Sequence, residues 1–572
     1  MFLLATDFDR TFYTNNTDLK RNIDNLPKFR ERNKFVIITG RSYGDFINLT
    51  KNSIKTDYLI VNHGATILKD DEIINSIYID ELTKKKLMEL FDFNKVTYFA
   101  SHDKDSRVDI NTLDLSKINI QLSDNLVAKK AADYINENFS DIEAYISMRH
   151  KNHIEIVNKK ANKANAIEYV SKLEKINKHL IYTVGDGYTD IEMIKQFNGY
   201  AISDAVDELK EYAIDTISSV SDMMDYLNVD VNLEDTDLEI TNFVNECYDR
   251  DDYFQKYMGK VYSKKNGQHL TIRKNSELIA CALLLSNNIY IENDIIDILT
   301  IGSICVDKKY RKKGYFKMLM GLIKKYEEKY DMGVLSGNIE KYKKYDYYPN
   351  ILNLYKFEAK SNNIIFKKMD DTYIDKALTM YNSKIHLNRN VDNFLEIANQ
   401  WKTDAYYIFN NNIFDGYLFY NTKKDFISEI RCSDINSASS SFAKLKNRDY
   451  INLKVFKSDY ETIKKLDGIS NSKMYNRQLY SIHNFKKIIS VYLNYKNEYS
   501  ELKKGELSIK IGDEIIKISV LDKIEVTDGN TYDMELTKEQ AMNIILNKKM
   551  TLNELLSSWF YLDIDIYNND LV

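Results

Sequence analysis

Short apolar runs that alternate with polar stretches of helical length dominate the first 65 residues. The runs are FLLATDF, FVIITG and YLIVNHG. Such runs, separated by enough residues for a helix, are typical of parallel strands joined by crossover helices. The pattern resumes from HIEIVN onward, with a helix predicted over 163–175 and then the strand HLIYTVGD, while residues from about 66 to 155 resemble a different unit. An α/β fold is therefore expected for this part of the chain.

The first of these strands ends in two closely spaced carboxylates, in the segment Asp7-Phe8-Asp9-Arg10-Thr11. A pair of this kind at the carboxyl end of a strand can reach a shared magnesium ion, one residue by its side chain and one by its backbone carbonyl. The cation would neutralise phosphate charge and leave one carboxylate free to attack in line. Acidic pairs are also common in solvated turns, so this interpretation needs support from other residues.

Three later segments supply that support in the order along the chain that such a site needs. The predicted strand FVIIT ends at Thr39 and is followed by Gly40-Arg41-Ser42, where a hydroxyl and backbone N–H groups can bind phosphate oxygens. Lys163 starts the predicted helix and offers a fixed positive charge, although alone it would be interpreted as a solvated lysine. In the segment GDGYTD, Asp186 can complete the magnesium shell, and Asp190 can hold Lys163 or a metal-bound water.

Together these motifs resemble the haloacid dehalogenase superfamily, specifically its Cof-like branch, over essentially all of residues 1–228. The resemblance implies a Rossmann-like core with an α+β cap at about 66–155. It also implies a magnesium-dependent phosphatase for a small phosphorylated metabolite, such as a sugar phosphate. The residues that it implies are Asp7 as nucleophile, Asp9 as general acid and base, Thr39 and Lys163 as phosphoryl-binding groups, and Asp7, Asp9, Asp186 and Asp190 at the metal site.

Two positions depart from the family pattern, and a third has two interpretations. Arg10 stands where the family usually has Gly, and Thr189 where it often has Asn. Neither change removes a catalytic group, so activity is expected. The turn Asn62-His63-Gly64-Ala65 is similar to the family's Asn-Gly-Ala turn. His63 either contacts substrate or, as is more common for a histidine beside a glycine turn, has a structural role.

The remaining chain is long enough for further domains, since 572 residues predict about three or four in total. The acidic stretch from Val229 to Asp237 lacks apolar periodicity and is expected to be a linker. Behind it, a β-rich region leads through Val306 into the basic loop DKKYRKKGYFK and a helix to about Tyr330. A basic, glycine-containing loop that opens a helix can bind a pyrophosphate, although a basic loop alone is usually solvated surface.

This loop resembles the acetyl-CoA loop of the Gcn5-related N-acetyltransferase superfamily, which reads Arg/Gln-x-x-Gly-x-Gly/Ala. Here it reads Arg311-x-x-Gly314-x-Phe316, and the bulky last residue departs from the general pattern. In that departure it is similar to the enhanced intracellular survival family, as is the segment Tyr342-x-x-Tyr345-x-Tyr347. The acetyl-CoA-binding residues that the resemblance implies are Val306, Arg311, Lys312, Lys313, Gly314, Tyr315 and Phe316.

The same resemblance covers about residues 233–572 and implies three domains. These are an N-acetyltransferase domain over 233–362, a second, degenerate acetyltransferase domain over 365–483, and a sterol-carrier-like domain over 484–572. It implies acetyl transfer to an amine acceptor, with Tyr342 as general acid toward the CoA thiolate and the terminal carboxylate of Val572 as base. The alternative for Leu571-Val572 is a frayed chain end.

The composition of the chain limits the kinds of partner that we expect, with regard to nucleic acids and membranes. The net charge is -5 with acidic and basic residues interleaved, so no nucleic-acid-binding stripe is expected. No apolar run approaches the roughly 20 residues of a membrane span, and no signal sequence follows Met1, so we expect a cytoplasmic protein with no membrane partner. The widely spaced cysteines are expected to be small buried hydrophobes. The acetyltransferase resemblance is compatible with a homo-oligomer.

The leading hypothesis is therefore a bifunctional enzyme, a phosphatase fused to an amine acetyltransferase. One alternative is a phosphatase whose rear domains form a non-catalytic ligand-binding or assembly module. Another is a phosphomutase, which would transfer the phosphoryl group within a substrate rather than to water. The sequence does not identify the phosphorylated substrate or the acetyl acceptor.

Overall fold

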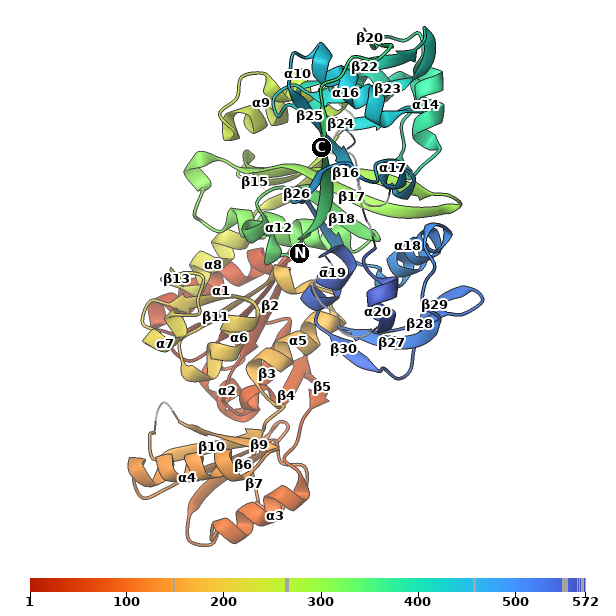
Figure 1. The fold of residues 1–572 in the computed structure, drawn as a ribbon. Helices are drawn as coiled ribbons and strands as arrows, with labels where there is room; N and C mark the ends of the chain where they lie inside the picture. Colours follow the sequence, from red (N-terminus) through yellow and green to blue (C-terminus); the bar gives the residue numbers. More distant parts are fainter. Residues whose placement is uncertain are drawn as a thin grey trace. The chain divides into compact units, whose positions relative to one another are not determined.

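The chain folds into two compact units, Met1–Val229 and Asp230–Val572, each described here by itself (Figure 1). The computed structural model describes residues 1–147, 150–262, 267–455, 459–547 and 554–562, together with residues 564, 566 and 570. Among the helices of these residues, none combines the length and the apolar character that a bilayer crossing requires.

A mostly parallel sheet forms the core of the first unit, in the strand order β13-β12-β11-β1-β2-β3-β4-β5. The strands from β13 to β3 are parallel, as predicted, and β4 and β5 add an antiparallel hairpin. β1 is buried along its whole length and lies between β11 and β2. The strands are β1 (Leu3–Asp7), β2 (Lys34–Ile38), β3 (Tyr58–Val61), β4 (Thr66–Lys69), β5 (Glu72–Ser76), β11 (Ile181–Gly185), β12 (Asn198–Ile202) and β13 (Thr216–Ile217).

Helices connect these strands, and polar side chains fix where three of them begin. Asn15, Ser42 and Asn162 accept backbone N–H groups in the first turns of α1, α2 and α5. Because Asn162 is the N-terminal capping residue of α5, Lys163 is the first residue of this helix, as the sequence predicted. The helices of this core are α1 (Asn16–Arg30), α2 (Tyr43–Thr50), α5 (Lys163–Leu173), α6 (Ile191–Gln196), α7 (Asp207–Lys210) and α8 (Val220–Leu227), with short 3-10 turns at Asn62–Gly64, Lys178–Leu180 and Tyr188–Asp190.

A second, antiparallel sheet lies between β5 and α5 in the chain, in the order β7-β6-β8-β10-β9. We call residues 81–158 the cap; it is drawn in orange in Figure 1. The cap has its own apolar core, which includes Leu87 of α3, Ile120 of β8 and Ile135 of α4. Its elements are α3 (Glu81–Leu90), β6 (Thr97–His102), β7 (Asp105–Val108), β8 (Lys117–Gln121), α4 (Asn125–Asn138), β9 (Ile142–Ile146) and β10 (His153–Asn158).

The cap borders differ from the expected 66–155 at both ends. The turn after β3 reverses the chain through positive φ angles at Asn62 and His63, so that Ile67 pairs with Ile60 in the core sheet. β4 and β5 therefore extend the core rather than the cap. The segment HIEIVN, which was expected to resume the parallel pattern, is β10 and pairs antiparallel with β8 and β9. A short apolar run does not by itself show which sheet a strand joins.

The second unit is built on one long sheet, in the order β14-β15-β16-β17-β18-β26-β19-β25-β24-β23-β22-β20, with β21 paired to β16. β17 and β18 are parallel and joined through α12, whereas β26 returns from late in the chain to pair with both β18 and β19. The strands are β14 (Asp230–Asp235), β15 (Gln268–Lys274), β16 (Glu277–Ile291), β17 (Asp294–Val306), β18 (Met332–Ser336), β19 (Tyr348–Glu358), β20 (Ile364–Lys368), β21 (His386–Leu387), β22 (Thr403–Asn410), β23 (Ile413–Asn421), β24 (Phe426–Arg431), β25 (Tyr450–Val455) and β26 (Asn471–Ile482).

The expected linker begins at the boundary between the two units, but most of the stretch from Val229 to Asp237 is strand β14 rather than irregular structure. Its backbone pairs antiparallel with β15, from Asp230 opposite Arg273 to Asp235 opposite Gln268. The acidic side chains that suggested a linker are those of an edge strand, where charge is common. The helices that accompany the long sheet are α9 (Leu238–Cys247), α10 (Tyr253–Tyr257), α11 (Gly259–Tyr262), α12 (Tyr315–Glu327), α13 (Ile339–Lys343), α14 (Ile374–Asn382), α15 (Val391–Ala398), α16 (Ile435–Leu445) and α17 (Tyr460–Lys465).

The last part of the chain adds a small sheet in the order β29-β28-β27-β30. Its apolar side chains share one core with the long sheet, since Trp559 and Ile509 cluster with Met332 of β18. All four cysteines are buried, as predicted. The elements are α18 (Phe485–Tyr499), β27 (Gly505–Ile511), β28 (Glu514–Val520), β29 (Ile524–Asp528), β30 (Met534–Leu536), α19 (Lys538–Asn547) and α20 (Glu554–Trp559).

Candidate active site

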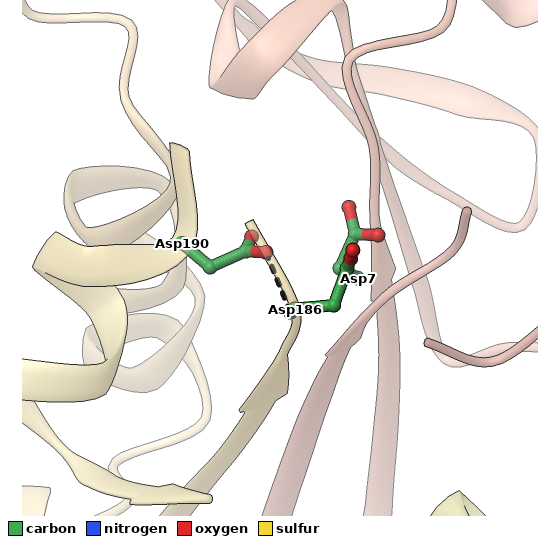
Figure 2. A group of neighbouring side chains, drawn as sticks. All are labelled: Asp7, Asp186 and Asp190. Atoms are coloured by element: carbon green, nitrogen blue, oxygen red, sulfur yellow. Dashed lines mark hydrogen bonds between the residues drawn. The ribbon is translucent and has the colours of Figure 1, made fainter. Parts of the chain in front are cut away.

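Three buried carboxylates meet at the carboxyl ends of β1 and β11. Asp7 is the last residue of β1, Asp186 directly follows β11, and Asp190 lies in the 3-10 turn after it. Because β1 and β11 are parallel neighbours, their carboxyl ends lie at one edge of the sheet. One carboxylate oxygen of each residue lies within 4.8 Å of the others, and the side chains converge in Figure 2. The structure thus brings together residues that are nearly 180 positions apart.

Lys163 bridges two of these carboxylates. Its Nζ lies 2.5 Å from Oδ1 of Asp7 and 2.6 Å from Oδ1 of Asp190. Burial by itself would lower the pKa of Lys163, but Asp190 and Asp7 outweigh it and raise that pKa. Lys163 is therefore a fixed cation beside Asp7, and its role as a phosphoryl-binding group stays a prediction.

Asp190 holds Lys163 and also orders the loop after β11. Its Oδ2 accepts the backbone N–H groups of Asp186 and Gly187 at 3.0 and 2.9 Å. A Cβ at Gly185 would lie 2.5 Å from Cβ of Asp190, so only glycine fits there. Both oxygens of Asp190 are thus engaged, which favours the role of holding Lys163 over that of a direct metal ligand.

The site holds more negative than positive charge. Burial, reinforced by Asp190 and Asp186, raises the pKa of Asp7 in spite of Lys163. Burial and Asp190 raise the pKa of Asp186 to about 6, although a hydrogen bond from Thr11 and the charge of Arg10 oppose the shift. Buried carboxylate oxygens with this excess of charge are the donor set that suits Mg²⁺. Asp7 and Asp186 therefore fit as side chains that would hold the cation.

Asp9 does not belong to the close group of Asp7, Asp186 and Asp190, and its side chain pairs with Arg41. Nε and Nη2 of Arg41 donate to the two oxygens of Asp9 at 2.7 and 2.8 Å. This bidentate pair fixes the direction of the Asp9 carboxylate. Arg41 belongs to a predicted phosphate-binding segment, but its pairing with Asp9 was not predicted. Its place directly after Thr39 and Gly40 was the available signal.

Thr39 lies just beyond β2 and is buried. Its backbone N–H donates to the carbonyl of Ile60 on β3, and its Oγ1 accepts the N–H of Arg41 at 3.1 Å. The hydroxyl proton is therefore available for a phosphate oxygen. We call Thr39–Arg41 the phosphate loop.

Arg10 adopts a positive φ of 62°, a conformation that glycine adopts without strain. The sequence departure therefore coincides with an unusual backbone conformation. Its Nε lies 3.4 Å from Oδ2 of Asp186, and its Nη2 donates to the carbonyl of Asp204. Arg10 thus partly neutralises Asp186 from the outer side. Thr189, the second departure, is half-buried in the turn before α6.

The predicted acetyl-CoA residues connect β17 to α12. Val306 and Tyr315 are buried, whereas Arg311, Lys312 and Lys313 are exposed. Arg311 donates to the backbone carbonyls of Val306 and Cys247.

Gly314 directly precedes α12 and has a φ of 83°, a left-handed conformation that glycine adopts without strain. The ring of Phe316 lies 6.2 Å from that of Tyr342, measured between centroids. Burial raises the pKa of Tyr342 to about 12. Val572 lies outside the described residues, although Asp570 is buried against Tyr381 and Arg389.

Residues 4–125 and 91–223 match the family model described as haloacid dehalogenase-like hydrolase. An uncharacterized protein of Mycoplasma capricolum is 27% identical over an alignment of 234 residues, and the match covers 34% of this chain and 87% of the relative. A haloacid dehalogenase-like hydrolase from B. subtilis is similar at 17% identity over 40% of this chain and 100% of its own, with a TM-score of 0.35. A haloacid dehalogenase-like hydrolase from Bacteroides thetaiotaomicron shows 17% identity over 40% and 99%, also with a TM-score of 0.35.

Proposed function

We propose that the first 229 residues, which carry a haloacid dehalogenase-like hydrolase domain, act as a magnesium-dependent phosphatase on a small phosphorylated metabolite. The observation that carries the proposal is the buried ammonium of Lys163 between Asp7 and Asp190, next to Asp186. The direct test is release of inorganic phosphate from a panel of phosphate monoesters by the full chain with Mg²⁺. No release from any of them would refute the proposal.

The reaction proceeds in two displacements at phosphorus. A carboxylate oxygen of Asp7 attacks, the bond to the leaving oxygen breaks, and Asp9 donates a proton to that oxygen. A water molecule then attacks the aspartyl phosphate while Asp9 takes a proton from that water. This step breaks the bond between phosphorus and Asp7, releases phosphate and restores Asp7. Lys163 and the hydroxyl of Thr39 hold phosphoryl oxygens, and Arg41 keeps Asp9 oriented. Bound Mg²⁺ supplies the positive charge that keeps Asp7 and Asp186 ionised and balances the phosphate.

A mutase remains the alternative within the same site, since both reactions begin with transfer to Asp7. The acceptor separates them, because a hydrolase passes the phosphoryl group to water and a mutase returns it to the substrate. Product analysis after incubation with sugar phosphates distinguishes free phosphate from an isomer of the substrate. We favour hydrolysis, because the matched family model is that of a hydrolase.

Affinity of the metal-free protein for Mg²⁺ is expected to rise about tenfold between pH 5 and pH 7. Protons and the cation compete for Asp186, whose pKa of about 6 means that it is mostly protonated at pH 5 and mostly ionised at pH 7. The raised pKa of Asp7 acts in the same direction. Calorimetric titration of the full chain after EDTA treatment measures the effect.

The matched control is Asp186→Asn, which cannot be protonated at this position. It is expected to bind Mg²⁺ more weakly, with a shallower pH dependence than the unaltered chain. An affinity of the unaltered chain that does not change between pH 5 and pH 7 would contradict the assignment of Asp186.

Acetyl transfer to an amine from acetyl-CoA is a second candidate function, for the second unit. The loop before α12 supports it, because Lys312 and Lys313 are exposed beside a helix start that carries no acidic side chain in its first turn. The raised pKa of Tyr342 keeps its phenol protonated at neutral pH, as a proton donor to a thiolate must be. The assignments of 365–483 and 484–572 as degenerate acetyltransferase and sterol-carrier-like domains remain predictions.

Binding of CoA to the full chain is expected to weaken about tenfold when Lys312 and Lys313 are both changed to Ala, because two cations facing a pyrophosphate are lost. Calorimetry on the double variant measures this, and Lys504→Ala, an exposed lysine elsewhere in the unit, serves as the matched control. No binding of CoA at millimolar concentration would instead favour a non-catalytic ligand-binding or assembly role.

A further inference from the structure

A second group of buried polar side chains lies where the cap meets the phosphate loop. Lys117 comes from β8 and Glu155 from β10, both in the cap, whereas His63 comes from the turn after β3 in the core. Lys117 and His63 are buried, and the carboxylate of Glu155 lies between them. None of these residues takes part in the reaction described above.

Lys117 reaches from the cap to the backbone of the phosphate loop. Its Nζ donates to the carbonyl of Gly40 at 2.6 Å and lies 3.4 Å from Oε2 of Glu155. A buried ammonium requires such partners, because an unpaired charge in the interior is strongly destabilising. Removing the side chain would therefore release the carbonyl of Gly40 from the cap.

The imidazole ring of His63 fills the space beside Gly40. A Cβ at Gly40 would lie 2.4 Å from Cε1 of His63, so the imidazole occupies the place of a side chain there. Burial, together with Lys117 and Lys163, lowers the pKa of His63 in spite of Glu155. Nε2 of His63 forms a hydrogen bond of 2.7 Å with Oε2 of Glu155. Tyr145 of β9 stacks on the ring at 5.2 Å between centroids.

Two features of His63 reduce the stability of the folded state and therefore indicate a functional role for this residue. Its φ of 59° is left-handed, which is uncommon for a residue other than glycine. Its Nδ1 is buried and has no hydrogen-bond partner in the described part of the chain. Strain and an unsatisfied polar atom at one residue are typical of positions that the surrounding structure holds for function.

The Gly40–Arg41 peptide group connects Lys117 to Thr39. The carbonyl of Gly40 and the N–H of Arg41 belong to one planar unit, so fixing the oxygen fixes the direction of the N–H. That N–H donates to Oγ1 of Thr39 at 3.1 Å. One peptide plane thus links the ammonium group of Lys117 to the hydroxyl group of Thr39.

We propose that Lys117, Glu155 and His63 form a clasp by which the cap positions the phosphate loop. Lys117 holds the Gly40–Arg41 peptide, Glu155 orients both Lys117 and His63, and the ring of His63 limits the movement of Gly40. All three are positioning residues, because they act through Thr39 and Gly40. The clasp makes a competent phosphate site conditional on a docked cap. It deepens the proposed phosphatase function and rests on it.

The test compares Lys117→Met with Lys84→Met in the full chain. Lys84 is a matched control, because it is equally a buried cap lysine that donates to a backbone carbonyl, that of Thr112, within the cap. Lys117→Met is expected to lower kcat/KM for p-nitrophenyl phosphate about 100-fold, since a misplaced binding group costs this much. Lys84→Met is expected to leave kcat/KM within about threefold even where its melting temperature falls equally. Lys117→Arg, which can still donate to the Gly40 carbonyl, is expected to recover most of the loss.

Amide hydrogen exchange gives a readout that does not depend on turnover. Exchange in a peptide spanning 39–42 is expected to be at least tenfold faster in Lys117→Met than in the unaltered chain or in Lys84→Met. If no variant or unaltered chain hydrolyses a phosphate ester, the proposed function fails and the exchange rates still decide on the clasp. Equal exchange in all three proteins, or an equal loss of kcat/KM in both Met variants, would overturn it.

Discussion

Asp7→Asn is expected to reduce phosphate release by a factor on the order of 10⁴ or more, because an amide oxygen does not form the phosphoenzyme. The substitution keeps the size of the side chain and removes one of three buried carboxylates whose charges repel one another. Lys163 keeps its contact with Asp190. The folded state should therefore be at least as stable as that of the unaltered chain.

Two measurements on the full chain test this expectation. Phosphate release from the best ester of the panel gives the loss of activity, and thermal unfolding gives the stability. Asp24→Asn, at an exposed position of α1, is the matched control and should change neither. Turnover by Asp7→Asn above about one per cent of the unaltered rate would rule out Asp7 as the nucleophile. Loss of activity with loss of folding would leave the role to be decided by Asp7→Glu, which retains a carboxylate at the wrong distance and should also be inactive while folded.

Arg389→Met is expected to lower the free energy of unfolding of the second unit by about 3–5 kcal/mol, because two buried carboxylates lose the guanidinium that they share. Arg389 is fully buried and pairs in bidentate fashion with Glu429 at 2.9 and 2.8 Å. It also binds both oxygens of Asp570 at 2.7 Å. Its guanidinium stacks on the ring of Tyr381 at 3.8 Å from the centroid.

Urea unfolding of the full chain, followed by hydrogen exchange resolved along the sequence, measures this loss separately for each unit. Arg448→Met is the matched control, since its ion pair with Asp425 is half-exposed and should contribute no more than about 1 kcal/mol. Adding Glu429→Gln and Asp570→Asn to Arg389→Met should recover part of the loss, because the uncompensated charges are then removed. A change below about 1 kcal/mol in Arg389→Met would show that the cluster contributes little to the stability of the unit.

The same cluster bears on the end of the chain. Asp570 stands two residues before Val572, and its own side chain is buried against Arg389. The frayed chain end that was the alternative for Leu571-Val572 therefore does not extend back to Asp570. The role of the terminal carboxylate as a base stays a prediction, because Val572 lies outside the described residues.

The parallel core, and the edge of its sheet at which Asp7 and Asp186 lie, followed from the sequence alone. Apolar runs such as FLLATDF mark buried strands by local composition, and a carboxylate at the end of such a run must lie at the carboxyl edge of the sheet. The position of Lys163 at the start of a helix was also predicted correctly. The neighbouring residue Asn162 favours a helix start there, because its side chain accepts a backbone N–H of the first turn. These features depend on a few consecutive residues, which is why a single sequence contains them.

The tertiary structure alone decided which distant segments pair. Local pattern could not show that β4 and β5 belong to the core sheet, that β14 is a strand, or that β26 lies between β18 and β19. Nor could local pattern show that Arg41 pairs with Asp9, or that Lys117 of the cap donates a hydrogen bond to the carbonyl of Gly40. Register, burial and the resulting shifts in pKa depend on residues far apart in the chain. The sequence therefore determined which chemical groups line the edge of the sheet, and the fold determined their partners and their charge.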